Sequence, residues 1–117
     1  MYQKENKPEY ILCSAVWYKE LPLKKPEVLR LRGYSPYNTD KGIVLCGWRH
    51  ANCLYQMVAI YGISNNEAGE SIQGFLTNLN RFVDRKEAME IALKSGQIKD
   101  KNKLINPRIG LFSEDLY

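Results

Sequence analysis

The sequence predicts a small α+β domain in which a mostly antiparallel sheet carries two main helices. Two apolar runs, at 10–18 and 43–47, have the length of strands, and two longer segments repeat apolar residues at helical spacing. The chain has 117 residues, which is the size of one domain. We therefore expect a single domain over 1–117, with its main helices near 50–61 and 84–95.

The first strand is expected at 10–18, where apolar residues occupy both faces. Ala15 and Trp17 have one parity and Val16 has the other. A strand that is apolar on both faces is typical of a central or well-covered position in a sheet. Further strands are expected at 43–47, 72–77, 81–83 and 109–112.

Both helices carry recognisable end signals. The first has one apolar face spaced i, i+3, i+4, i+7, and Gly62 is its expected stop. The residues of that face are Leu54, Met57, Val58 and Tyr61. The second begins with a capping-box pattern, in which Asp84 caps the helix and Glu87 stands three residues on, and Gly96 ends it.

Two segments are expected to be irregular. Residues 1–8 are charged and polar, so we expect them to be flexible. Residues 19–42 are interrupted by Pro22, Pro26, Gly33 and Pro36 and are expected to form a long loop, which in a compact domain is usually functional or disordered. No apolar signal-peptide core and no run of about 20 apolar residues follows, so we expect a cytoplasmic protein without membrane contact.

The composition favours anionic ligands but not duplex nucleic acid. The formal net charge is +4, and the longest basic clusters are short, such as Lys24-Lys25. Cys13, Cys46 and Cys53 form no Cys-x-x-Cys motif, which indicates reduced thiols, and with one histidine in the chain we expect no metal and no cofactor.

Arg49 and His50 are the first candidate site residues. They stand at the junction of a predicted strand and a predicted helix, where free main-chain N–H groups and the helix dipole attract anions. An arginine and a histidine at this position can hold a phosphate. The structural alternative is a solvated Arg49 and a His50 that serves as a capping or core residue.

Two further regions are candidates. Arg81 and Arg85 flank Phe82 at the start of the second helix, although Phe82 also fits a core position. In the loop, Tyr34 or Tyr37 can stack on a base while a neighbouring arginine meets phosphate, and the alternative is an ordinary polar loop or an oligomer contact.

The inventory for catalysis is thin. A Cys–His pair of His50 with Cys46 or Cys53 is conceivable, but no nucleophile elbow, Walker loop or paired histidines occur. His50 beside Arg49 has the chemistry of a general acid, yet no second catalytic group is identifiable. Glu114 and Asp115 near the C-terminus suit a ribose hydroxyl or a base edge, or a frayed terminus.

Four segments together resemble a widespread group of short phage and prophage proteins. They are Gly47–Cys53, Gly74–Thr77, Arg81–Ala88 and Leu111–Tyr117, and the similarity covers most of residues 10–117. The group is similar to phage anti-defence sponges of the anti-CBASS or Thoeris anti-defence type. That resemblance implies a homo-oligomer that binds a cyclic di- or oligonucleotide, or a cyclic ADP-ribose type signal, without cleaving it.

Three hypotheses therefore stand: a nucleotide-binding sponge, a small phosphodiesterase or hydrolase that uses His50, and a protein-interaction module that inhibits a host enzyme. For the sponge we expect Arg49, His50, Arg81 and Arg85 to converge on the ligand, with Phe82 or a loop tyrosine stacked on its base. A homo-oligomer is expected also because two tryptophans and eight tyrosines exceed what one small core hides.

Overall fold

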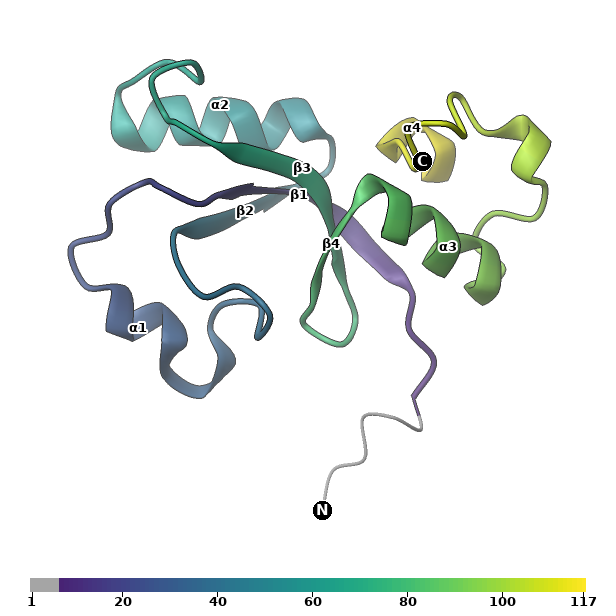
Figure 1. The fold of residues 1–117 in the computed structure, drawn as a ribbon, viewed down its shortest axis with the longest axis horizontal. Coiled ribbons are helices and arrows are strands. Elements are labelled where there is room, and N and C mark those ends of the chain that lie inside the picture. The colour runs from purple at the N-terminus through teal and green to yellow at the C-terminus, as the bar shows by residue number, and fades with distance from the viewer. Residues whose placement is uncertain (1–6) are drawn as a thin grey trace.

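The computed structural model describes residues 7–117 and contains a four-stranded antiparallel sheet in the order β2-β1-β3-β4 (Figure 1). The predicted α+β fold is confirmed. Of the residues expected to be flexible, 1–6 lie outside the described part. The strands are β1 (Ile11–Tyr18), β2 (Ile43–Gly47), β3 (Ser71–Thr77) and β4 (Phe82–Asp84). The helices are α1 (Pro26–Arg30), α2 (His50–Tyr61), α3 (Arg85–Ser95) and α4 (Ser113–Leu116), with 3-10 turns η2 (Leu31–Gly33) and η3 (Lys101–Lys103).

Both long helices cover the same face of the sheet. Directly paired residues on neighbouring strands point to the same face. Val16 pairs with Leu45, and both belong to the buried cluster under α2. Phe75 pairs with Val83, and both belong to the buried cluster under α3. Ser14 pairs with Phe75, and it lies two residues before Val16 on β1. Ser14 and Val16 therefore point to the same face, so both clusters lie on that face. The two helices therefore cover different parts of the same face of the sheet.

The opposite face is covered by the segment 19–42. Trp17 and Phe82 meet there edge to face, with ring centroids 5.8 Å apart. The Trp17 indole donates to the Lys41 carbonyl at 2.8 Å, and the Asn38 side chain bonds both the N–H and the C=O of Phe82. These contacts fix the segment to the sheet, and it contains the short helix α1 and the turn η2 (Figure 1).

The ends of the helices follow the signals in the sequence. The Asp84 carboxylate accepts from the Glu87 N–H at 2.9 Å, and Gly62 and Gly96 adopt left-handed conformations at φ 69° and 85°. The Glu87 side chain does not complete a capping box, because it forms an ion pair with Arg81 instead. Within residues 7–117, no helix has both the length and the apolar character needed to cross a bilayer.

The prediction of a strand at 109–112 is wrong. The structure has an isolated bridge between Asn106 and Gly110, and then the helix α4 begins at Ser113. The Asp115 carboxylate accepts from the N–H groups of Phe112 and Ile105, at 2.8 and 3.0 Å. A carboxylate three residues after Phe112 therefore starts a helical turn where a strand was expected.

We predict that Gly74→Ala is strongly destabilising, because a Cβ at this position would lie 2.0 Å from the Val83 carbonyl oxygen. We expect a loss of about 3 kcal/mol, at the upper end of overpacking costs. Gly62→Ala is the matched control: its Cβ meets nothing within 4 Å and only its positive φ opposes the change, so about 1 kcal/mol is expected. Urea unfolding measures both values, and equal losses would contradict the prediction.

Candidate functional site

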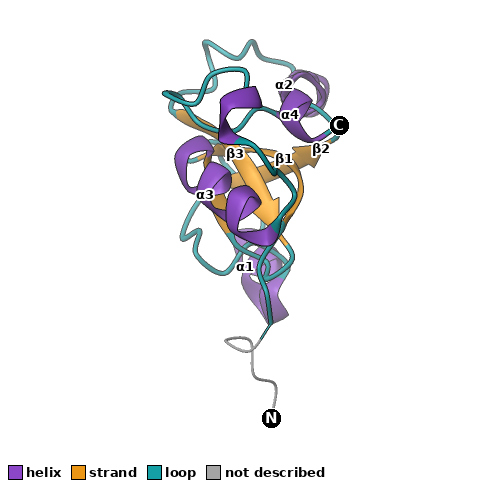
Figure 2. Ribbon diagram, turned by 90° about the vertical axis from the view of Figure 1, so that its right-hand side faces the viewer, coloured by secondary structure: helices purple, strands orange, loops and turns teal. Residues whose placement is uncertain are grey.

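The starts of α2 and α3 meet beneath the C-terminal segment 111–117. His50 Nε2 lies 2.8 Å from the carbonyl oxygen of Gly74 on β3. The guanidinium of Arg85 donates to the Leu111 carbonyl at 2.8 Å, and that of Arg49 to the Ser113 hydroxyl at 3.4 Å. The short helix α4 accordingly lies beside the first turn of α2 in both ribbon views (Figures 1 and 2).

His50 is the most buried charged or titratable group at this junction, with 9% of its surface exposed. A carbonyl oxygen only accepts, so the contact with Gly74 places the imidazole proton on Nε2 and leaves Nδ1 as an acceptor. Among residues 7–117, Nδ1 has no hydrogen-bond partner, yet it is not a buried unsatisfied atom. It is therefore open to solvent or to a ligand.

The His50 ring is neutral at pH 7. Burial lowers its pKa, and the positive charge of Arg85 lowers it further, while the bond to Gly74 and the carboxylate of Glu114 act in the opposite direction. The ring also packs edge to face against Phe75, with centroids 5.1 Å apart. A neutral, oriented imidazole can accept a hydrogen bond from a hydroxyl or amine of a ligand.

Arg49 is held between aromatic rings at the edge of the junction. Its guanidinium lies 4.4 Å from the centroid of the Trp48 ring and 5.3 Å from that of Tyr117, and it also donates to the main-chain oxygen of Tyr117. The Asn52 side chain accepts from the Arg49 N–H, and no side chain caps the first N–H groups of α2. Trp48 itself is 63% exposed.

Arg85 fastens the C-terminal segment to α3. Its guanidinium bonds Leu111 and the Gln73 side chain, at 2.8 and 2.7 Å, and stacks 4.3 Å from the Phe112 ring. The Leu111 N–H returns a bond to the Arg85 carbonyl at 2.8 Å. A Cβ on Gly110 would lie 2.3 Å from that same carbonyl, so the approach requires glycine.

Two carboxylates act on the two arginines: Glu114, and Asp115, whose charge reaches Arg85. Glu114 is exposed, and its pKa is lowered by its own main-chain N–H, by the Ser113 hydroxyl, by the charge of Arg49 and, at low pH, by the protonated form of His50. The junction therefore combines two guanidinium groups and free helix N–H groups, which suit an anion, with two acceptors, which suit a hydroxyl or a base edge. Within residues 7–117, no cluster of metal-ligating side chains is present.

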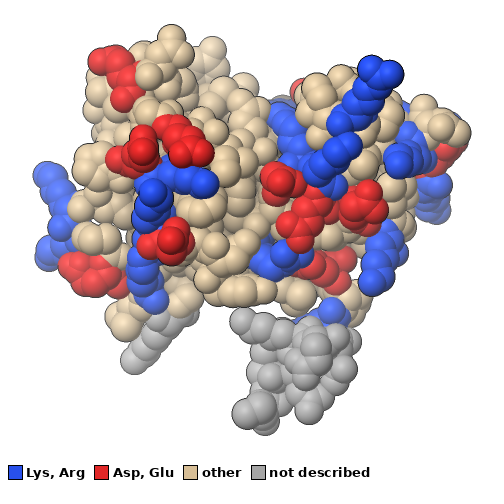
Figure 3. Space-filling model, in the orientation of Figure 1, with Lys and Arg blue, Asp and Glu red and all other residues tan. Residues whose placement is uncertain are grey.

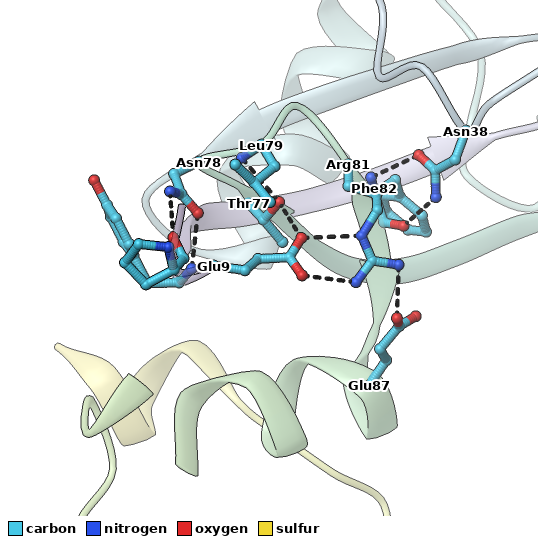
Figure 4. A network of polar contacts seen from close by, with 10 residues as sticks. Glu9, Asn38, Thr77, Asn78, Leu79, Arg81, Phe82 and Glu87 are labelled. Atoms are coloured by element: carbon cyan, nitrogen blue, oxygen red, sulfur yellow. Dashed lines mark hydrogen bonds and ion pairs between the residues drawn. The ribbon is translucent and has the colours of Figure 1, made fainter. Parts of the chain in front are cut away.

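Of the candidate residues, the structure brings Arg49, His50 and Arg85 together, but not Arg81. Arg81 donates twice to Glu9, both at 2.9 Å, and pairs with Glu87 at 2.7 Å (Figure 4). This network lowers the pKa of Glu9 and ties the chain before β1 to the start of α3. The convergence expected for Arg81 fails because two carboxylates already hold its guanidinium.

The aromatic candidates also lie elsewhere. Phe82 is only 5% exposed and packs against Trp17 on the other face of the sheet, so it has no free ring face for a base. Tyr34 and Tyr37 are exposed, but they belong to the segment near Asn80, on the side of the sheet away from α2. Trp48 and Tyr117 are the rings beside the arginines. The segment 111–117 is one of the four segments that resemble the phage proteins, but nothing local in the sequence indicated that it packs against α2.

The thiols form no pair with His50. Burial raises the pKa of Cys53 to about 11, and its Sγ donates to the carbonyls of Ser14 and Arg49. Cys46 lies instead beside Cys13, and a hydrogen bond from the Cys46 thiol lowers the pKa of Cys13 to about 7. The Cys–His arrangement considered from the sequence is therefore not what the fold assembles.

Comparison with known proteins identifies the family. A protein-family model described as "Phage T4 y16D protein" matches residues 10–117. The chain belongs to this phage protein family. No curated protein and no solved structure matches the chain.

We predict that His50 titrates below its ordinary pKa of 6.5, because burial disfavours the imidazolium. It is the only histidine, so its imidazole signals in an NMR titration need no assignment. Because the folded-state pKa is depressed, the stabilisation from a neutral His50 is complete above 6.5 and is lost as the pH falls through the folded pKa. Glu114→Gln should lower the pKa further. A wild-type value at or above 6.5 would refute the prediction.

Proposed function

We propose that this phage protein binds and sequesters a cyclic nucleotide immune signal in the cytoplasm of the bacterial host, and does not cleave it. The signal would be a cyclic di- or oligonucleotide, or of the cyclic ADP-ribose type. The observation that carries the proposal is the meeting of Arg49, His50 and Arg85 where two helices begin.

The chemistry of this junction favours a phosphate group. The first N–H groups of α2 have no side-chain cap, and the helix dipole places partial positive charge there. Arg49 is half-buried, so its bonds to an anion are weakened less by water than those of a surface arginine. A charge-assisted contact of this kind contributes about 1.5–3 kcal/mol.

The rings beside the arginine favour a nucleotide over a simple anion. Trp48 is exposed, and the Arg49 guanidinium that contacts its ring also contacts the ring of Tyr117. Stacking of a base on one aromatic side chain contributes about 1–3 kcal/mol without demanding a particular base. Trp48 and Tyr117 therefore take the place that Phe82, Tyr34 and Tyr37 had in the expectation from the sequence.

The protonation states favour binding over hydrolysis. Cleavage of a phosphodiester commonly needs a base for the nucleophile and an acid for the leaving oxygen. His50 is neutral and keeps its single proton in the bond to Gly74, and the lowered pKa of Glu114 leaves it ionised at pH 7. Both groups accept protons and neither is poised to give one.

A retention experiment tests the proposal. The purified protein is incubated with cyclic dinucleotides, cyclic trinucleotides and cyclic ADP-ribose, separated from unbound compound, and denatured by heat, and the released compounds are identified by mass spectrometry. Recovery of an intact cyclic nucleotide at stoichiometric yield is expected. Conversion would instead support a hydrolase that uses His50, and no retention would favour the protein-interaction module.

We predict that Arg49→Ala and Arg85→Ala each weaken binding of the retained nucleotide by about tenfold to a hundredfold, from the loss of one charge-assisted contact. Isothermal titration calorimetry measures the affinities. Arg30→Ala is the matched control, because Arg30 is an exposed arginine of α1 whose guanidinium donates to the Thr39 carbonyl. Unchanged affinity in both site variants would remove these residues from the site.

A further inference from the structure

We propose that the free edge of β2 and the adjoining strip of α2 form a two-fold interface with a second copy of this chain. We call this the α2–β2 surface, and it consists of Ile43–Gly47, Asn52, Gln56 and Ile60. The inference concerns assembly and does not depend on which ligand the site takes.

The strip of α2 lies directly beside the edge of β2. Asn52, Gln56 and Ile60 are spaced four residues apart, so they form one row along the helix. The Gln56 amide donates to the Cys46 carbonyl at 2.8 Å, and a Cβ on Gly47 would lie 2.7 Å from Cβ of Asn52. Helix row and strand edge are therefore one continuous surface.

The edge of β2 offers unpaired main-chain groups. β2 is the outermost strand, and its register with β1 pairs Val16 with Leu45. The Cys46 carbonyl points toward Gln56 and therefore away from β1. Main-chain groups alternate in direction along an antiparallel strand, so the N–H and C=O of Val44 also point away from β1. Within residues 7–117, no main chain outside the sheet bonds to β2. The Gln56 amide uses one of the two lone pairs of the Cys46 carbonyl, and the second remains for a donor from a neighbouring strand.

The surface lacks the charges that usually protect an edge. None of the residues in Ile43–Gly47 is charged, and neither are the residues of α2 other than His50, which is buried and neutral. By contrast α3 carries five charged residues in eleven, and the other edge strand β4 is three residues long and ends in Asp84. Figure 3 shows the contrast: the upper region where α2 runs is mostly tan, whereas blue and red side chains crowd the lobe of α3.

These features select a second copy as the occupant. Two-fold pairing brings identical residues together, so a charged edge would meet its like, and this edge has no charge to repel. With Leu45 on the axis, Val44 of one copy exchanges N–H···O bonds with Cys46 of the second copy. Ile60, which is 64% exposed on its own chain, then lies against the neighbouring protomer.

Sedimentation equilibrium tests the interface. We expect the wild type to have twice the monomer mass of 13.6 kDa at micromolar concentration. Ile60→Glu places a charge in the interface, and Val44→Pro removes an outward N–H while sparing the bonds to β1, so each should raise the dimer dissociation constant at least about tenfold. Ile105→Glu is the control, an equally exposed isoleucine outside the surface, and should remain dimeric.

Circular dichroism identifies any variant that fails to fold. Ile60→Glu changes an exposed side chain and should fold, so this variant tests the interface even if Val44→Pro unfolds. A wild type that stays at 13.6 kDa across the micromolar range would overturn the proposal. So would an assembly that Ile60→Glu leaves intact. Nucleotide retention by a monomeric protein would separate a failure of this interface from a failure of the binding site.

Discussion

The close approach at Gly74 is the contact on which the rest of the structure depends. Without a side chain, β3 can bring its backbone against Val83 on β4, and the Gly74 carbonyl remains available to His50. The approach of Gly74 to Val83 sets where α3 begins, since Arg85 follows β4 directly. The bond between the Gly74 carbonyl and His50 sets where α2 begins. One glycine thus helps to place two helix starts near each other on one face, and these starts carry Arg49, His50 and Arg85.

The three arginines show how the same side chain takes different roles according to what faces it. Arg81 meets two carboxylates and becomes part of the framework. Arg85 meets a carbonyl, an amide and a ring, so it joins the segment 111–117 to β3 and to the start of α3. Arg49 also has two hydrogen-bond partners, the Ser113 hydroxyl and the main-chain oxygen of Tyr117, but it lies beside the exposed Trp48. A ligand that stacks on Trp48 would therefore meet Arg49 before Arg85.

Local signals predicted the fold well because its helices end on local chemistry. Asp84, Gly62 and Gly96 each act within a few residues, and their effect is legible in the sequence. The misplaced residues depend on distant partners. Arg81 is held by Glu9, 72 positions away, and Phe82 is buried because the segment 19–42 folds over its face of the sheet. The contact of Arg49 with Ser113 spans 64 positions, so the sequence indicated Glu114 and Asp115 as possible ligand contacts but not the placement of their segment against α2.

The proposed interface and the candidate site share one stretch of chain. β2 ends at Gly47, and Trp48, Arg49 and His50 follow without a turn residue between them. A lone edge strand is bonded on one side only, whereas a strand paired on both sides has its main chain fixed along its whole length. Pairing of β2 with a second copy would therefore restrict the backbone that carries Trp48 and Arg49. Ordering them before the ligand arrives lowers the entropy that binding must overcome, which is how assembly can strengthen a site that lies wholly within one chain.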